Sequence, residues 1–191
     1  MKRFFCLLWL TAITLAADPL LAGEQSLYFN IGLGWADPAY EDEMEAILSE
    51  LEDLPDMDHM SIAVDLALYF PMGSSGMLGP ALTGIGDRFE QNGVEMQINN
   101  YLFGISFRQY VSGERGKGLY IRGDAGLARV VTQATDQDDF VSDVGTGVLL
   151  GGGYSFEIAD GRWCTVNADY AYKKVEGDKV GGLSIGGALM F

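Results

Sequence analysis

The end of the chain constrains its fold more than any other segment. The last eleven residues read GGLSIGGALMF, and the larger apolar residues there alternate with mostly small ones. On one face of an extended strand lie Leu183, Ile185, Leu189 and Phe191. Neighbouring side chains of a strand point to opposite faces, so this period of two predicts a β-strand with one apolar face.

Seven further segments alternate in the same way. They span residues 26–36, 60–70, 77–88, 97–111, 118–131, 144–158 and 163–173. In the third segment Pro80 lacks the amide hydrogen of a central strand, so we expect a bulge there or a later start. With the final strand the sequence predicts eight strands, which is an even number.

The connections between these segments alternate in length. Four are long, at 37–59, 89–96, 132–143 and 174–181, and three are short, with the sequences PMGSSG, SGERGK and ADGR. Membrane barrels have short periplasmic turns and longer extracellular loops, and their strands need about 9–11 residues. We therefore predict an all-β fold, an eight-stranded antiparallel up-and-down transmembrane barrel with long extracellular loops.

A soluble, lipocalin-like barrel also has eight strands, so the polar face must decide between the two. That face carries chiefly Gly, Ala and Ser with a few charges, which suits a crowded interior and not a water-exposed surface. Aromatic residues gather near both ends of the apolar faces, as in the girdles of membrane barrels. The sequence thus favours an apolar face that points into lipid.

The N-terminus has the pattern of a secretory signal peptide. Lys2 and Arg3 precede an apolar run from Phe4 to Ala16, and small residues follow near Ala22. We expect residues 1–22 to be cleaved, which leaves residues 23–191 as one barrel domain. The leader carries two bases and one acid (Asp18), so its removal changes the net charge from -15 to -16. Such acidity argues against nucleic acid as a partner.

An apolar last strand that ends on an aromatic resembles the assembly signal of bacterial outer-membrane barrels, carried here by Leu189 and Phe191. With the strand pattern, the whole chain resembles the small eight-stranded barrels grouped with OmpX, the OmpA membrane domain and OmpW. The resemblance implies a bacterial outer-membrane location, outer-membrane lipid as surroundings and the barrel assembly machinery as a partner during biogenesis. Such proteins have structural, adhesive, channel or lipid-modifying roles.

Parity places several charged side chains inside the barrel. They are Asp65, Arg108, Arg122, Asp124, Glu157 and Asp169. An unpaired buried charge is costly, so we expect each arginine to bridge neighbouring carboxylates in a packed polar network. The alternative is a narrow pore, whose conductance would be lost on Arg122→Ala.

The first long loop is strongly acidic. Residues 37–58 hold ten acids and no base, including Glu41, Asp42, Glu43, Glu45, Glu50, Glu52 and Asp53. Apolar residues recur among them at helical spacing, namely Met44, Ile47, Leu48, Leu51 and Leu54. We expect a short amphipathic helix there, solvated or placed to meet divalent cations or an extracellular protein.

The single histidine, His59, precedes Ser61 by two residues. A His-x-Ser pair resembles the catalytic pair of outer-membrane lipid A deacylases, but Pro55 and Ile62 stand where that motif has an aromatic residue and an asparagine. Parity also turns the pair toward the lumen. We therefore expect no enzyme and no cofactor, and a structural or surface-interaction role, with a small channel as the alternative and a lipid-modifying enzyme as a weaker one.

Overall fold

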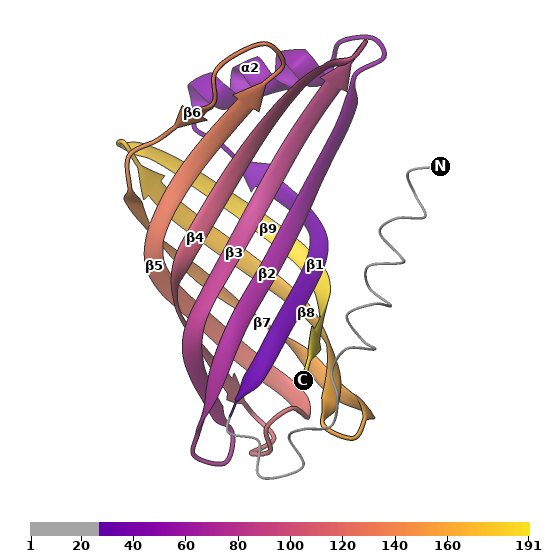
Figure 1. The fold of residues 1–191 in the computed structure, drawn as a ribbon, viewed down its shortest axis with the longest axis vertical. Helices are drawn as coiled ribbons and strands as arrows, with labels where there is room; N and C mark the ends of the chain where they lie inside the picture. The colour runs from indigo at the N-terminus through magenta and orange to yellow at the C-terminus, as the bar shows by residue number, and fades with distance from the viewer. Residues whose placement is uncertain (1–26) are drawn as a thin grey trace.

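The computed structural model describes residues 27–191, and within them eight long antiparallel strands close into a barrel (Figure 1). They are β1 (Tyr28–Ala39), β2 (Asp58–Met72), β3 (Gly76–Gln91), β4 (Val94–Tyr110), β5 (Gly118–Ala134), β7 (Gly145–Ala159), β8 (Arg162–Val175) and β9 (Asp178–Met190). A helix, α2 (Asp42–Glu52), follows β1, and a two-residue strand, β6 (Phe140–Val141), pairs with β5. The predicted fold class is confirmed. The predicted leader, 1–22, lies outside the described residues.

The last strand closes the barrel against the first. β9 pairs with both β1 and β8, and β4 pairs with β5, so the sheet is continuous around the barrel. Phe191 extends the β1–β9 pairing. Its amide donates to the carbonyl oxygen of Phe29 at 3.0 Å, and its carbonyl oxygen accepts from the amide of Phe29 at 2.7 Å. β1 begins and β9 ends at the end of the short turns, opposite α2 (Figure 1).

The third strand is longer and more regular than expected. β3 runs without a bulge, and Pro80 lies inside it, paired with Ile105 of β4. On the other side the pairing with β2 skips Gly79 and Pro80 and then resumes in the same register. The expectation of a bulge or late start was therefore wrong, because the missing amide of Pro80 costs only a local gap in one ladder.

Two of the four connections expected to be long are tight hairpins. β3 and β4 are joined by Asn92 and Gly93, with φ of 52° and 85°. β8 and β9 are joined by Glu176 and Gly177, with φ of 55° and 103°. Positive φ at both central residues is typical of the type I′ turn, whose twist matches that of the two strands of a hairpin. Long loops therefore remain only between β1 and β2 and between β5 and β7.

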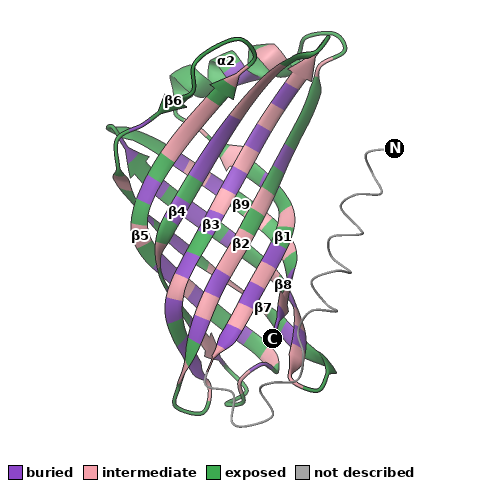
Figure 2. Ribbon diagram, viewed as in Figure 1, coloured by how far each residue is buried: buried purple, intermediate pink, exposed green. Residues whose placement is uncertain are grey.

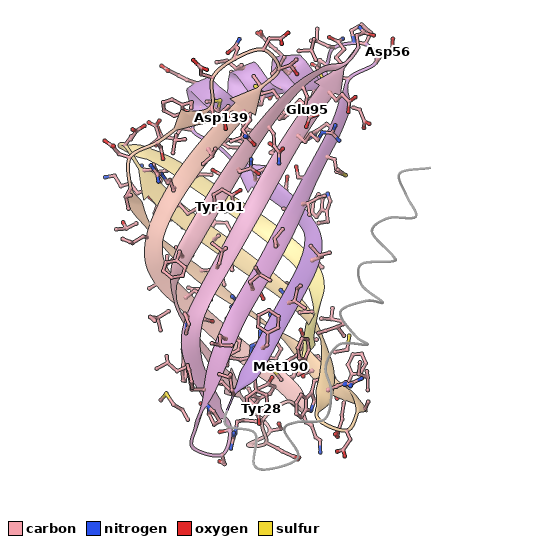
Figure 3. All side chains as sticks on the ribbon, in the orientation of Figure 1. Tyr28, Asp56, Glu95, Tyr101, Asp139 and Met190 are labelled. Carbon is pink, nitrogen blue, oxygen red and sulfur yellow. The ribbon has the colours of Figure 1, made fainter. Side chains whose placement is uncertain are left out.

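Buried and exposed residues alternate along each strand, as the banding in Figure 2 shows, and the exposed ones include many large apolar side chains while the buried ones include most of the interior charges. Trp35, Phe103, Leu150 and Tyr170 each expose more than half of their surface, whereas Arg122 is 4% exposed. Tyr101 projects from the outer wall (Figure 3). An apolar outer wall of this extent is stable against lipid and not against water, which excludes the lipocalin-like alternative.

The interior is packed from the turn end upward. An aromatic layer closes the turn end, where Tyr28 packs against Trp163 and Tyr110 against Tyr120. Small residues make room for these rings and for close strands: a Cβ on Gly104 would lie 2.1 Å from the carbonyl oxygen of Ala125. The small residues expected of a crowded lumen are therefore required by the backbone spacing itself.

Candidate functional site

Arg122 is the centre of the charged network in the middle of the lumen. Its guanidinium reaches Asp65 Oδ1 on β2 at 2.8 Å and both oxygens of Asp124, two residues along β5, at 3.0 and 2.7 Å. Asn30 of β1 donates to the second oxygen of Asp65 at 2.7 Å. One arginine thus joins two carboxylates on different strands, as the sequence predicts.

Arg108 on β4 is paired directly with Arg122 on β5, but its surroundings are different. Its guanidinium lies between the rings of Tyr69 and Tyr120, 4.9 and 4.4 Å from their centroids. A bond to the amide oxygen of Asn30, at 3.4 Å, completes the neutral surroundings. The expectation that Arg108 also bridges carboxylates was wrong, because the aromatic layer at this height offers it π faces instead.

Asp169 and Lys173 occupy the upper part of the lumen. Asn167 donates to Asp169, and Lys173 Nζ donates to the carbonyl oxygen of Asn100 at 2.8 Å. Both side chains line a cavity of about 30 Å³, which has the size of one or two water molecules. Lys173 is only 2% exposed, and the sequence reading did not include it among the interior charges. Parity along β8 with Asp169 could have identified it.

Glu157 does not belong to this network. It is exposed near the short-turn end of β7, and one of its carboxylate oxygens lies 3.6 Å from Lys117 Nζ. Parity gave its face correctly beside buried Ser155, but the strand leaves the lumen before Glu157 is reached. The assignment of Glu157 to the interior was therefore wrong.

At the opposite end, α2 packs on the barrel mouth (Figure 1). Leu48 is buried in a cluster with Phe89 and Ile98 of the strands below. The helix predicted from the loop sequence is therefore present, but Met44 and Ile47 stay largely exposed on it. No helix within residues 27–191 is both long and apolar enough to cross a membrane.

The acids of this loop take different positions around α2. Asp42, Glu43 and Glu45 lie in its first turn, where the partial positive charge of a helix N-terminus favours them. Glu41 precedes the helix and accepts the backbone amide of Lys179 at 3.1 Å, while Asp53 follows the helix. Glu50 and Glu52 lie in the last turn, which has no base of its own.

His59 of β2 contacts this last turn of α2. Its Nδ1 lies 2.8 Å from Glu52, and its Nε2 lies 2.6 Å from Asp87 on β3. Asp87 is nearly fully buried and also accepts hydrogen bonds from Ser61, at 2.5 Å, and Tyr40, at 3.1 Å. Burial and the Asp87 carboxylate raise the pKa of Tyr40, so this phenol stays protonated and donates. We call these five residues the His59 hub.

The hub borders a gap in the barrel wall. Pairing of β1 with β2 ends at Trp35 and Ile62, although β1 continues along β9 as far as Ala39. The two strands diverge there, and a cleft of about 340 Å³ lies between them and α2. Exposed Trp35 and Met60 border it together with the hub, so the hub is reached from the side as well as from the mouth.

The hub is not arranged as a hydrolytic triad. Ser61 Oγ lies 3.2 Å from His59 Nε2, but it donates its hydrogen to Asp87. The two imidazole nitrogens face the carboxylates of Glu52 and Asp87. The Ser61 hydroxyl is therefore directed at Asp87 and not at the imidazole that nucleophilic catalysis would need as its base. This geometry favours a structural latch between α2 and the rim.

The acids at the mouth do not converge on one point. Among the residues that the structure describes, no group of three or more His, Cys, Asp or Glu side chains is placed to hold a metal ion. In the loop before β7, the side chain of Asp139 accepts a hydrogen bond from Gln133. The backbone amide of Asp143 donates to the carboxylate of Glu176. The acidity is therefore spread over a surface and not collected into a site.

Comparison with known proteins identifies the fold and not the family. No protein-family model matches the sequence, and no curated protein is significantly similar to it. The structure resembles the crystal structure of Ail, the attachment invasion locus protein of Yersinia pestis, with a TM-score of 0.53 and 14% identity over 87% of this chain and 100% of that one. It also resembles Neisserial surface protein A, with a TM-score of 0.60 and 10% identity over 87% and 96%. At such identities the likeness shows a shared barrel fold alone.

Proposed function

We propose that this protein is an integral barrel of the bacterial outer membrane whose lumen is closed and whose acidic outer end is an interaction surface. It acts without a cofactor and without catalysis. The apolar outer wall, the eight-stranded fold shared with surface proteins of two bacteria and the predicted leader all support this location. Loops that project from a rigid scaffold are where binding residues concentrate.

The observation that carries the proposal is the partition of charge between lumen and mouth. Below the mouth, the lumen holds three acids and three bases, namely Asp65, Asp124, Asp169, Arg108, Arg122 and Lys173. Balanced, bonded charges of this kind stabilise a filled interior. Residues 37–58 hold ten acids and no base, and all ten are exposed, although Glu41 and Glu52 also bond within the protein.

The sign of that charge restricts the partner. The Yersinia pestis protein has also been solved in complex with sucrose octasulfate, a heparin analogue. The excess of acid at the mouth of the present barrel repels such a polyanion, because like charges at a surface oppose association. We therefore propose a partner that is cationic or neutral.

Planar-bilayer recording tests the closed lumen. We expect the purified protein to insert without reproducible conductance steps, since side chains fill the lumen and the cavity among them is about 30 Å³. Arg122→Ala removes the central side chain and is the matched variant for detecting a weakened plug. Regular unitary steps from the unaltered protein would favour the small channel and overturn the proposal.

A further inference from the structure

A second hollow at the mouth borders the start of α2. Its volume is about 910 Å³, and it runs between the start of α2, the loop that holds β6 and the β8–β9 hairpin. This volume is at the upper end of the roughly 300–1,000 Å³ typical of ligand pockets. We call this hollow the α2 groove.

The lower part of the α2 groove is apolar. Ile98, Val130 and Val180 lie along it, and Met44 and Ile47 of α2 border it. Met44 and Ile47 are 45% and 56% exposed, so they form the part of the helix's apolar face that the barrel leaves uncovered. Apolar side chains on both a floor and a wall favour a ligand with apolar side chains of its own.

The rim of the groove is acidic. It carries five acids and one base, which are Glu41, Asp42, Glu43, Glu176, Asp178 and Lys179. Tyr170 and Tyr172, which are exposed on the outer wall, also line the groove. Tyrosine rings and carboxylates both attract ammonium and guanidinium groups, so the rim favours cations at the edge of an apolar floor.

We propose that the α2 groove binds a cationic amphipathic segment of another protein. Its apolar side chains lie on Val130, Met44 and Ile47, and its lysines or arginines meet the acidic rim. Helices with one apolar face are commonly recognised in grooves of this kind. The inference rests on the proposed interaction role and names the chemistry of the partner.

Charge complementarity selects this occupant over others. A second copy of the chain carries a net charge of -15 and would bring acid to acid. A polyanion or an anionic lipid headgroup meets the same repulsion. A divalent cation alone would leave the apolar floor exposed, and the acids within residues 27–191 do not converge on a metal position.

The test is titration of a fluorescein-labelled peptide, KLAKLAKKLAKLAK, against the protein in nanodiscs of zwitterionic lipid, read by fluorescence anisotropy. Empty nanodiscs give the background from lipid. We expect saturable binding to the protein-loaded discs that weakens as sodium chloride rises, since salt screens surface charges. Equal binding to empty and loaded discs would overturn the proposal.

Two triple variants separate the groove from general acidity. The groove variant carries Glu43→Gln, Glu176→Gln and Asp178→Asn, and the control carries Asp53→Asn, Asp56→Asn and Asp138→Asn. Both remove three negative charges from exposed positions, and only the first set lines the groove. We expect the groove variant to bind about tenfold more weakly, because three charges that face the ligand are removed, and the control to change less than about twofold.

Equal losses in the two triple variants would show attraction by net charge alone and overturn the groove. Ile47→Asn provides an independent readout, because it changes the apolar wall of the groove without changing charge, and unaltered binding there would also contradict the proposal. Failure of the groove is distinguishable from failure of the proposed function. A barrel that stays silent in planar bilayers and fails to bind this peptide retains its closed lumen but loses this partner class.

Discussion

Replacing Arg122 with leucine is expected to lower the free energy of unfolding by about 3–5 kcal/mol, the cost typical of breaking a buried ion pair from one side. The change leaves Asp65 and Asp124 in the lumen without the cation that bonds both of them. Arg122 and Asp124 are nearly fully buried, so solvent cannot replace the lost partner. Urea unfolding in phospholipid vesicles, followed by tryptophan fluorescence, measures the difference.

Two matched variants show whether the loss comes from unpaired charge. Adding Asp65→Asn and Asp124→Asn to Arg122→Leu removes the orphaned carboxylates, and more than half of the lost stability should return. Lys174→Leu makes the same kind of change at an exposed position and should shift stability by less than about 0.5 kcal/mol. A single Arg122→Leu variant as stable as the unaltered barrel would contradict the charged network.

His59→Ala is expected to loosen α2 while the barrel stays folded. The change removes the bonds to Glu52 and Asp87 and the stacking of the imidazole on Phe89, whose ring centroid is 4.4 Å away. Charge-assisted bonds at a half-exposed position contribute about 1–2 kcal/mol together. Since 1.4 kcal/mol is a factor of ten, the amides of residues 42–52 should exchange about tenfold faster.

Hydrogen exchange read by mass spectrometry on the protein in nanodiscs measures this effect. Ser61→Ala is the matched control, because it removes one donor to Asp87 and leaves the contacts of His59 with Glu52 and Asp87 in place. The control should exchange like the unaltered protein in α2. Unchanged exchange of α2 in His59→Ala would show that Leu48 and its neighbours hold the helix alone.

Much of the fold is predictable from the sequence because alternation has a period of two and barrels repeat it. All eight strand positions follow from that pattern, and so does α2 from apolar residues at helical spacing. Strand ends are harder to predict. Asn92-Gly93 and Glu176-Gly177 each close a tight hairpin. The polar residues on either side of these turns look like loop residues in the sequence, but they belong to the strands.

The site is less predictable because parity gives the face of a residue and not its height in the barrel. Glu157 has the correct face but lies at the short-turn end beside Lys117, outside the packed lumen. Arg108 has the correct face, but its height sets it between two tyrosine rings. The partner of His59 was hidden for another reason: Asp87 belongs to the strand that Pro80 made difficult to interpret.

The charges in the lumen and the charges at the mouth have different roles. Arg122 and its partners hold the strands together, since every one of their bonds stays inside the barrel. The His59 hub holds α2 at the rim, and the uncovered Met44 and Ile47 border the α2 groove. Substitutions in the lumen should therefore change stability, and substitutions at the groove should change binding.

Gel migration of the outer-membrane fraction with and without boiling tests the central claim most directly. A closed membrane barrel resists detergent at room temperature and runs as a compact species, and boiling unfolds it. We predict a band in the outer-membrane fraction that migrates faster unboiled than boiled. Identical migration of the two samples, or recovery of the protein in the soluble fraction, would contradict the account of this chain as an outer-membrane barrel.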